Sequence, residues 1–365
     1  MKSKQVSEKL GPAFNRLFSA SVISNLSDGL LAVAAPLLAI SLTKDPVLIS
    51  MLSAFVMLPW LLFAIPIGLI VDRSDKRLLV TLTNSIRFIT AGLVALAIST
   101  DTITIYWLLL ATFLIGTCEV ATDTAAQSLI PVILEKKNFE KANSRMNIAE
   151  TVIQNFIGAP LSGFLYATAI VLPFILNSLG FLIAAIFVFM IPAHLISQGS
   201  SVETTVLEKK SFISEIKFGL NYLWNDRPLR RLVATTTSLG LFYSLSTSTL
   251  ILFITEILEV QAKYFGVLMA GAGSGGVLGG VLTPVLSKKF GRGAVLAVAI
   301  FISSITVIFQ GLSPNVWVFG VIGFISTFSI TNWNILLMST YQSVIPGHLF
   351  GRIHGTRRTL VWGLM

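Results

Sequence analysis

Residues 46–99 read PVLISMLSAFVMLPWLLFAIPIGLIVDRSDKRLLVTLTNSIRFITAGLVALAIS. Two apolar runs, 46–71 and 78–99, flank a short charged turn at 72–77. Each run is long enough for a helix, rising 1.5 Å per residue, to cross the roughly 30 Å hydrocarbon core of a bilayer. This stretch therefore predicts a hairpin of two membrane-spanning helices.

Apolar runs of this kind account for most of the chain. Hydrophobic residues make up 54% of the 365 positions and charged residues 12%, about half the charge that a soluble domain carries. The expected fold class is an all-α integral membrane protein with ten complete spans and the start of an eleventh. The other predicted spans are 17–42, 104–127, 145–168, 170–192, 232–256, 264–287, 293–311 and 315–340, with the eleventh beginning near Thr356.

The net charge of +9 is distributed in a way that indicates topology. Every lysine and arginine falls on the side of the N-terminus except Lys44, Lys263 and Arg87. Because basic residues are retained in cytoplasmic loops during insertion, we expect a cytoplasmic N-terminus in a bacterial cell membrane. The cations form no basic face, so the expected partner is the lipid bilayer and not nucleic acid.

One long polar connection divides the sequence. We expect 1–192 to form an N-terminal half of six helices, 193–231 a cytoplasmic linker, and 232–365 an incomplete C-terminal half. Within the linker, the apolar residues of 212–224 share one helical face, as in an amphipathic helix lying at the membrane surface. Two halves of six helices would require roughly two further spans, which predicts a fragment or a natural truncation.

Five ionisable residues fall inside the predicted spans. They are Asp28, Arg87, Glu119, Asp123 and Glu150. A charge at a helix centre costs about 2.5–3.5 kcal/mol on insertion scales, so such a residue is expected to be functional or paired. Counted from the inner ends of their spans, Arg87 and Glu119 lie at one depth, which predicts an ion pair between them. Asp123, nearer the cytoplasm, is expected to pair with Arg73 or Arg77.

Polar residues repeat at helical spacing on three predicted spans. These stripes are Ser21, Ser24, Asn25 and Asp28 on the first, Thr112, Gly116, Glu119, Asp123 and Gln127 on the fourth, and Asn147, Glu150, Thr151, Gln154 and Gly158 on the fifth. Together they predict a wet cavity. Asp28, with Glu119 or Glu150, is the candidate for carrying a coupling proton or for binding a cationic substrate. Asp123, Arg87 and Gln154 are the further candidate residues of the cavity. The alternative for Asp28 is a hydrogen bond to a neighbouring helix.

Several segments have close counterparts, in the same order, in a known family. They are SNLSDG (24–29), LPW (58–60), GLIVDRSDKR (68–77), QSLIP (127–131), KAN (141–143), GAPLSGFL (158–165), PFILNSLGF (173–181) and FGLNYLWNDRPLRRL (218–232). With them the chain resembles a major facilitator superfamily transporter, of the branch that contains macrolide and multidrug efflux proteins and siderophore exporters. The resemblance implies a fold of two six-helix halves.

Two motifs carry functional implications of this resemblance. The first is the family's gating signature, which corresponds to residues 68–77. Gly68, Asp72, Arg73, Lys76 and Arg77 match the family's pattern there, while Asp75 replaces the usual second glycine. The resemblance implies that Asp72 and Arg77 stabilise an outward-facing state. Gly158, Pro160 and Gly163 resemble the fifth-helix motif of drug–proton antiporters, although close helix packing explains the same small residues.

The resemblance implies a secondary transporter: a monomeric, proton-coupled exporter of drugs such as macrolides or of other small amphipathic molecules. The alternatives are an exporter of a specific metabolite, siderophore or lysophospholipid, a transport-inactive truncated relative, or a membrane enzyme acting on lipids. We disfavour an enzyme, a metal or another cofactor. The loops hold no acidic or histidine cluster, and the Gly271–Gly276 match to a dinucleotide motif lacks a preceding strand.

Overall fold

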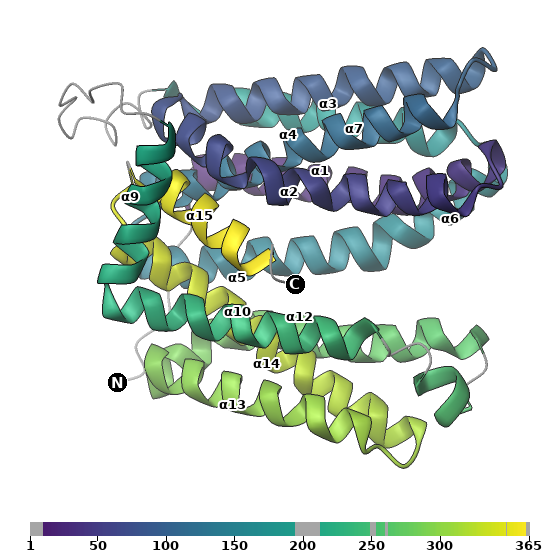
Figure 1. Ribbon diagram of the computed structural model, residues 1–365. Helices are drawn as coiled ribbons and strands as arrows, with labels where there is room; N and C mark the ends of the chain where they lie inside the picture. Colours follow the sequence, from purple (N-terminus) through teal and green to yellow (C-terminus); the bar gives the residue numbers. More distant parts are fainter. Residues whose placement is uncertain (1–9, 194–211, 249–252, 260–261, 348, 363–365) are drawn as a thin grey trace.

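The computed structural model describes residues 10–193, 212–248, 253–259, 262–347 and 349–362 (Figure 1). All regular structure in these ranges is helical, which confirms the predicted all-α class. Most of the helices run side by side along one common direction, as expected for elements that cross a bilayer (Figure 1).

The first part of the chain forms a group that we call the first bundle. Its helices are α1 (Gly11–Leu42), α2 (Pro46–Arg73), α3 (Lys76–Ser99), α4 (Ile105–Ile133), η1 (Lys136–Asn138), α5 (Phe139–Ala149), η2 (Glu150–Gly158), α6 (Ala159–Thr168) and α7 (Leu172–Phe189). α7 packs against α1 and α3, while α4 packs against α2 and α3. The predicted fifth span is thus built from α5, a π-helix, η2, and α6.

The remainder contains a second bundle made of α10, α12, α13 and α14. The helices after α7 are α9 (Phe212–Asn225), α10 (Arg227–Ser248), η4 (Phe253–Ile257), α12 (Ala262–Phe290), α13 (Arg292–Gly311), α14 (Val316–Val344) and α15 (Phe350–Trp362). α14 packs against α12 and α13. α15 packs chiefly against α2 of the first bundle and against α9, and it also contacts α10 of the second bundle.

Capping aspartates fix two of the short turns in the first bundle. Asp45 precedes α2 and accepts a hydrogen bond of 2.8 Å from the backbone nitrogen of Val47. Asp75 accepts from the backbone nitrogens of Arg77 (2.9 Å) and Leu78 (3.2 Å) at the start of α3. Each carboxylate satisfies donors that the first turn of a helix leaves free. At position 75 the side chain therefore has a structural role of its own, as the cap of α3.

Seven of the described helices are long and apolar enough to cross a membrane. They are α1, α2, α3, α4, α7, α13 and α14. The count of ten complete spans and part of an eleventh stays a prediction. Several helices extend beyond the predicted spans: α1 begins at Gly11 and not at 17, α4 ends at Ile133 and not at 127, and α15 begins at Phe350 and not near Thr356. Because a helix N-terminus that binds a carboxylate needs no apolar flank, hydropathy did not reveal this start.

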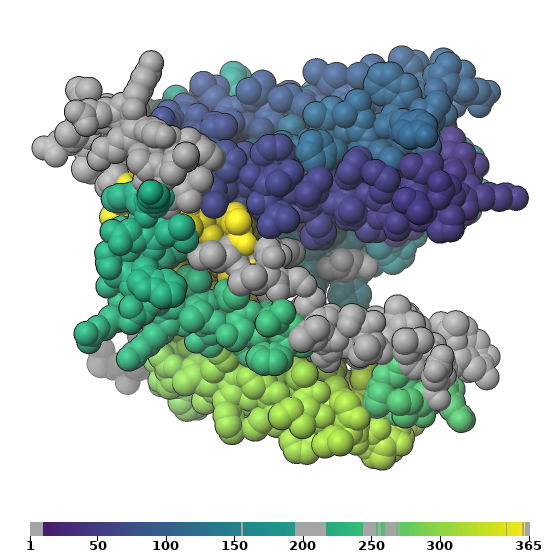
Figure 2. Space-filling view, in the orientation of Figure 1, coloured from purple at the N-terminus to yellow at the C-terminus, as the bar shows by residue number. Residues whose placement is uncertain are grey.

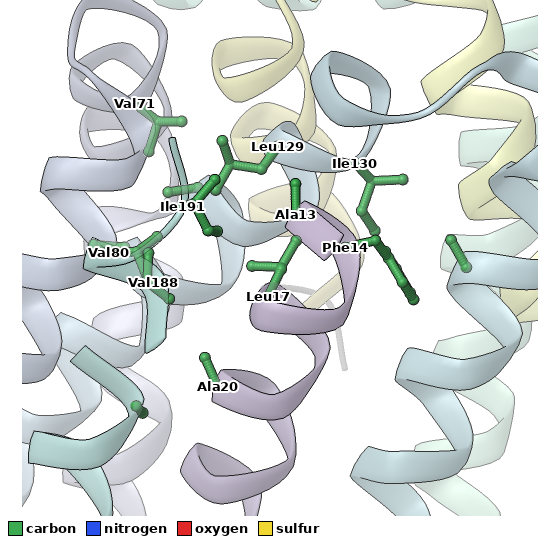
Figure 3. Close-up of a cluster of buried hydrophobic side chains, with 14 of the residues drawn as sticks. Ala13, Phe14, Leu17, Ala20, Val71, Val80, Leu129, Ile130, Val188 and Ile191 are labelled. Carbon is green, nitrogen blue, oxygen red and sulfur yellow. The ribbon is translucent and has the colours of Figure 1, made fainter. Parts of the chain in front are cut away.

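Tight packing joins α1, α2, α3, α4 and α7 at one end of the first bundle (Figure 3). Phe14 and Leu17 of α1 belong to one cluster with Val71, Leu129 and Val188, all of them almost completely buried. In a bilayer the lipid competes for apolar contacts, so close side-chain packing of this kind is what holds helices together. This end of the bundle is therefore expected to move as one unit.

The two bundles meet at this same end. Asn143 of α5 donates to Gln342 (2.6 Å) and Ser339 (3.1 Å) of α14, and Glu140 binds Arg292 of α13. Toward the opposite end the bundles part, and Figure 2 shows a hollow between them on the right of the view. The contacts gather at the end that the distribution of lysine and arginine predicts to be cytoplasmic.

α9 lies across this end of the molecule, over α15 (Figure 1). Leu223 points inward and is buried, whereas Phe218, Leu220 and Trp224 are exposed. Gly219 contacts α15 so closely that an added Cβ would lie 2.6 Å from Oγ1 of Thr356. A helix that packs on the protein through Leu223 and leaves large apolar side chains exposed fits the predicted amphipathic helix at a membrane surface.

Candidate substrate cavity

A cavity of about 510 Å³ lies between the two bundles. Residues of α1, α4, α5 and η2 line one wall, and residues of α10, α13, α14 and α15 line the other. Apolar side chains such as Leu239, Ile330 and Met338 alternate with polar ones. The volume lies within the range of pockets that enclose drug-sized molecules.

The three predicted polar stripes converge on this cavity. Five of the six candidate residues line it: Asp28, Glu119, Asp123, Glu150 and Gln154. The outer part of the stripe on α4 does not contribute. Thr112 is buried and donates to the backbone oxygen of Leu108, and Gly116 packs against Pro59 of α2. Only the half of that stripe nearer the joined end of the bundles therefore faces the cavity.

The sixth candidate, Arg87, is buried behind the wall, with 1% of its surface exposed. Its guanidinium binds the carboxylate of Asp28, donates to Oγ of Ser24 at 3.1 Å, and lies 3.9 Å from the ring centre of Phe181. The predicted pairing of Arg87 with Glu119 is wrong. Counting residues along a span gives depth in the membrane but not the direction in which a side chain points, and Arg87 points toward α1.

Glu119 and Glu150 stand apart from this pair. Within the described ranges, no residue forms a hydrogen bond or salt bridge with either carboxylate. Glu150 begins the π-helix η2, which also carries Gln154. π-helices occur preferentially at functional sites, because the wider turn re-aims side chains and leaves backbone groups less tightly bonded.

Asp123 has a partner that the sequence did not predict. Its carboxylate lies 3.7 Å from the guanidinium of Arg358 on α15, instead of pairing with Arg77 as one of two predicted options. Arg77 binds the backbone oxygen of Ile191 at 2.9 Å. Arg357 and Arg358 both line the cavity. Sequence reasoning counted them among the cytoplasmic cations at the start of the last predicted span and did not predict that they line the cavity.

The signature turn, 68–77, is joined to α15 through Asp72. Its carboxylate accepts from the backbone nitrogens of Gly351 (2.6 Å) and Arg352 (2.8 Å) and from Nε of Arg352 (3.2 Å). The Asp72 and Arg352 side chains are both buried, at 1% and 5% exposure. The first turn of α15 presents free N–H groups and the positive end of its dipole, which together suit an anion.

Glycines make this contact possible. A Cβ on Gly68 would lie 2.3 Å from the backbone oxygen of Gly351, and one on Gly355 would lie 2.2 Å from the backbone oxygen of Ala64. α2 and α15 therefore touch backbone to backbone. Of the other signature residues, Arg73 ends α2 and Lys76 begins α3.

The antiporter-like motif packs against α1. An added Cβ on Gly158 would lie 3.0 Å from Cα of Gly29, and Oγ of Ser162 donates to the backbone oxygen of Leu30 at 2.6 Å. Pro160 lies in the first turn of α6, directly after the π-helix η2. Gly163 has open space around its Cα. Close packing explains Gly158, whereas nothing in the structure explains Gly163.

Substituting Gly29 with alanine is expected to destabilise the protein by about 1–3 kcal/mol, because the new methyl group overpacks a backbone contact. Its Cβ would lie 2.4 Å from the backbone oxygen of Gln154. Gly163→Ala is the matched control, since nothing lies within 4 Å of its added Cβ. Thermal unfolding of the purified variants in detergent measures the difference, and equal melting temperatures would contradict the close contact.

An all-helical bundle with a polar cavity buried at its centre is the architecture of a membrane transporter. The family described as transmembrane secretion effector, of the major facilitator superfamily, matches residues 10–365, and the chain belongs to this family. It is a multi-pass secondary transporter, and the expectation that it is not an enzyme is confirmed.

Individual relatives agree with this assignment. YkuC of Bacillus subtilis (strain 168), described as an uncharacterized MFS-type transporter, is 22% identical over 357 residues, which cover 94% of this chain and 80% of that protein. A bacterial homologue of the iron transporter ferroportin, solved in an outward-facing state, has a TM-score of 0.75 at 14% identity, covering 96% of this chain and 89% of that chain. The human organic anion transporter TETRAN has a TM-score of 0.75 at 15% identity, covering 97% and 90%. These structures share the major facilitator fold.

Proposed function

We propose that this transporter is a proton-coupled exporter of drug-sized amphipathic molecules. The observation that carries the proposal is the pair of cavity carboxylates, Glu119 and Glu150, that hold no cation within the described structure. A carboxylate of this kind can exchange a proton with the cavity without breaking an ion pair. Asp28 is bound to Arg87, so we assign the coupling proton to Glu119 and Glu150 and a supporting role to Asp28.

Alternating access supplies the transport step. With the N-terminus in the cytoplasm, the Asp72–Arg352 and Glu140–Arg292 contacts close the cytoplasmic end of the cavity. In the proposed cycle, protons from outside neutralise the cavity wall and these contacts open. The protons then leave to the cytoplasm, substrate binds in their place, and reclosing of the contacts exposes it to the outside.

Efflux from cells that express the protein tests this proposal. We expect a fluorescent cationic dye, a macrolide or both to leave the cells faster than from control cells, and a protonophore to remove the difference. Glu150→Gln and Glu119→Gln are expected to abolish the protonophore-sensitive part, because an amide carries no exchangeable acid proton. Asp101→Asn is the matched control, an exposed carboxylate in the turn between α3 and α4.

The outcomes separate the candidate functions. Efflux that survives in both glutamine variants would contradict the assigned proton carriers. Efflux of neither compound would favour an exporter of one specific metabolite, siderophore or lysophospholipid, or a transport-inactive relative.

A further inference from the structure

Four residues of one cavity wall have hydrogen-bond donors for which no described residue supplies an acceptor. These are Nε1 of Trp333, Oη of Tyr341, Nε of Arg357 and Nη1 of Arg358, all buried atoms. Each of the four residues lines the cavity, two from α14 and two from α15. A buried donor without an acceptor costs about 1–3 kcal/mol, and proteins rarely leave several together without a function.

Neighbouring groups hold the two arginines in place. The guanidinium of Arg357 lies 5.0 Å from the ring centre of Tyr341, and Nη2 lies 3.3 Å from Nδ1 of His354. Arg358 stacks 4.0 Å from the ring centre of Trp60. Arg357 forms no salt bridge with a described residue, and among the described residues Arg358 forms a salt bridge with Asp123 alone, at 3.7 Å. Two fixed cations therefore line the cavity, and each keeps a buried nitrogen without a hydrogen-bond partner among the described residues.

The acidic and basic groups of the cavity come from different helices, which meet where Asp123 lies 3.7 Å from Arg358. Glu119, Asp123 and Glu150 lie on the wall of the first bundle, and Arg357 and Arg358 lie on the wall of α15. Among its described residues, the α14–α15 wall offers no anionic partner to a cationic group. A planar guanidinium instead matches a carboxylate, sulfonate or phosphate group, which accepts two parallel hydrogen bonds.

We propose that the α14–α15 wall binds the acidic group of an amphipathic organic acid. Arg357 and Arg358 bind the acid, the Tyr341 hydroxyl and the Trp333 indole donate to its remaining oxygens, and the apolar residues of α10 and α13 hold its body. The acid competes with Asp123 for Arg358. This inference rests on the proposed function, and it names one substrate class within it, amphipathic molecules that carry an acid.

Equilibrium binding to the purified full chain in detergent tests it. The probes are a xanthene dye with a free carboxylate and the methyl ester of the same dye, which differ only in the acid. We expect the acid to bind about tenfold more tightly or better, the effect of hydrogen bonds between charged partners. Arg357→Gln is expected to reduce the affinity for the acid to that for the ester, and Arg357→Lys to retain part of the preference because it retains the charge.

Tyr341→Phe keeps the ring and removes only the hydroxyl. Because that hydroxyl has no partner in the described structure, the melting temperature is expected to stay unchanged while the acid binds several-fold more weakly. If Arg357→Gln does not fold, the affinity of Tyr341→Phe for the acid tests the inference in its place. Arg231→Gln, at an exposed arginine outside the cavity lining, is the matched control.

The acid has two possible sources, a lipid headgroup or a soluble organic acid. Competition against the bound dye by an anionic lysophospholipid and by a soluble aromatic carboxylate distinguishes them. Equal affinity for acid and ester, or a preference that persists in both Arg357→Gln and Tyr341→Phe, would overturn the inference. Since binding is measured without transport, a protein that prefers the acid but moves no substrate would contradict the proposed function alone.

Discussion

Asp72→Asn is expected to shift the protein strongly away from the conformation in which α2 and α15 are joined. The carboxylate accepts three hydrogen bonds from Gly351 and Arg352 and is the acidic partner of a buried ion pair. Removing one partner of such a pair costs about 3–5 kcal/mol. A change of 3 kcal/mol alters the ratio of two conformations more than about a hundredfold, enough to reverse their populations.

Cysteine labelling reports this shift. Cys118 is the chain's only cysteine, so Cys118→Ser with Asn147→Cys gives a single thiol in the cavity wall. In the Asp72→Asn background we expect an impermeant maleimide to react faster from the cytoplasmic side and more slowly from the outside, and the transport rate to fall. Asp75→Asn is the matched control, because asparagine caps a helix about as well as aspartate does. Unchanged labelling and transport after neutralising both Asp72 and Arg77 would contradict a gating role for the signature.

Asp28→Asn is expected to cost about 3–5 kcal/mol of unfolding free energy, because it leaves the guanidinium of Arg87 buried without a counter-charge. Arg87 is 1% exposed, and its remaining contacts are the Ser24 hydroxyl and the Phe181 ring. Since the loss comes from the stranded cation, Arg87→Gln combined with Asp28→Asn is expected to recover much of the stability. A double variant no more stable than Asp28→Asn would contradict the pair.

Asp123→Asn provides the comparison for that experiment. Asp123 is 42% exposed, and its partner Arg358 lies 3.7 Å away, so removing the charge is expected to change stability by less than about 1 kcal/mol. Thermal unfolding in detergent ranks the three variants. Proton-driven efflux that persists in Asp28→Asn would support our assignment of proton transfer to Glu119 and Glu150.

Much of the fold could be predicted because a bilayer imposes simple rules. Helices must satisfy their own backbone hydrogen bonds and must be long enough to cross, so apolar length alone locates α1, α2, α3 and α4 within a few residues. The start of α15 also lies before the predicted one, at Phe350, where the backbone nitrogens of Gly351 and Arg352 bind Asp72. A start that depends on a tertiary contact leaves no signal in hydropathy.

The sequence predicted the residues of the cavity wall formed by α1, α4 and η2, but not those of the wall formed by α14 and α15. Polar spacing on α1, α4 and η2 identified the residues that line the cavity, because a polar stripe in a membrane helix must face the protein interior. Spacing along one helix says nothing about the rotation of the neighbouring helix, so it could not identify ion pairs. This is why the pairing of Arg87 with Asp28 instead of Glu119 was not predicted. Arg357 and Arg358 were counted among the cytoplasmic cations because basic residues are typical of cytoplasmic loops. Only the position of α15 shows that they line the cavity.

The most direct measurement reconstitutes the purified protein in liposomes that contain a pH-sensitive dye. An inward proton gradient is imposed, and the movement of ethidium and of the xanthene acid is followed together with that of protons. We predict that at least one of the two compounds moves against the proton flow, and that Glu150→Gln abolishes both movements. Movement of either compound with no accompanying proton flux, or equal rates in the wild type and Glu150→Gln, would contradict a proton-coupled exporter that works through this cavity.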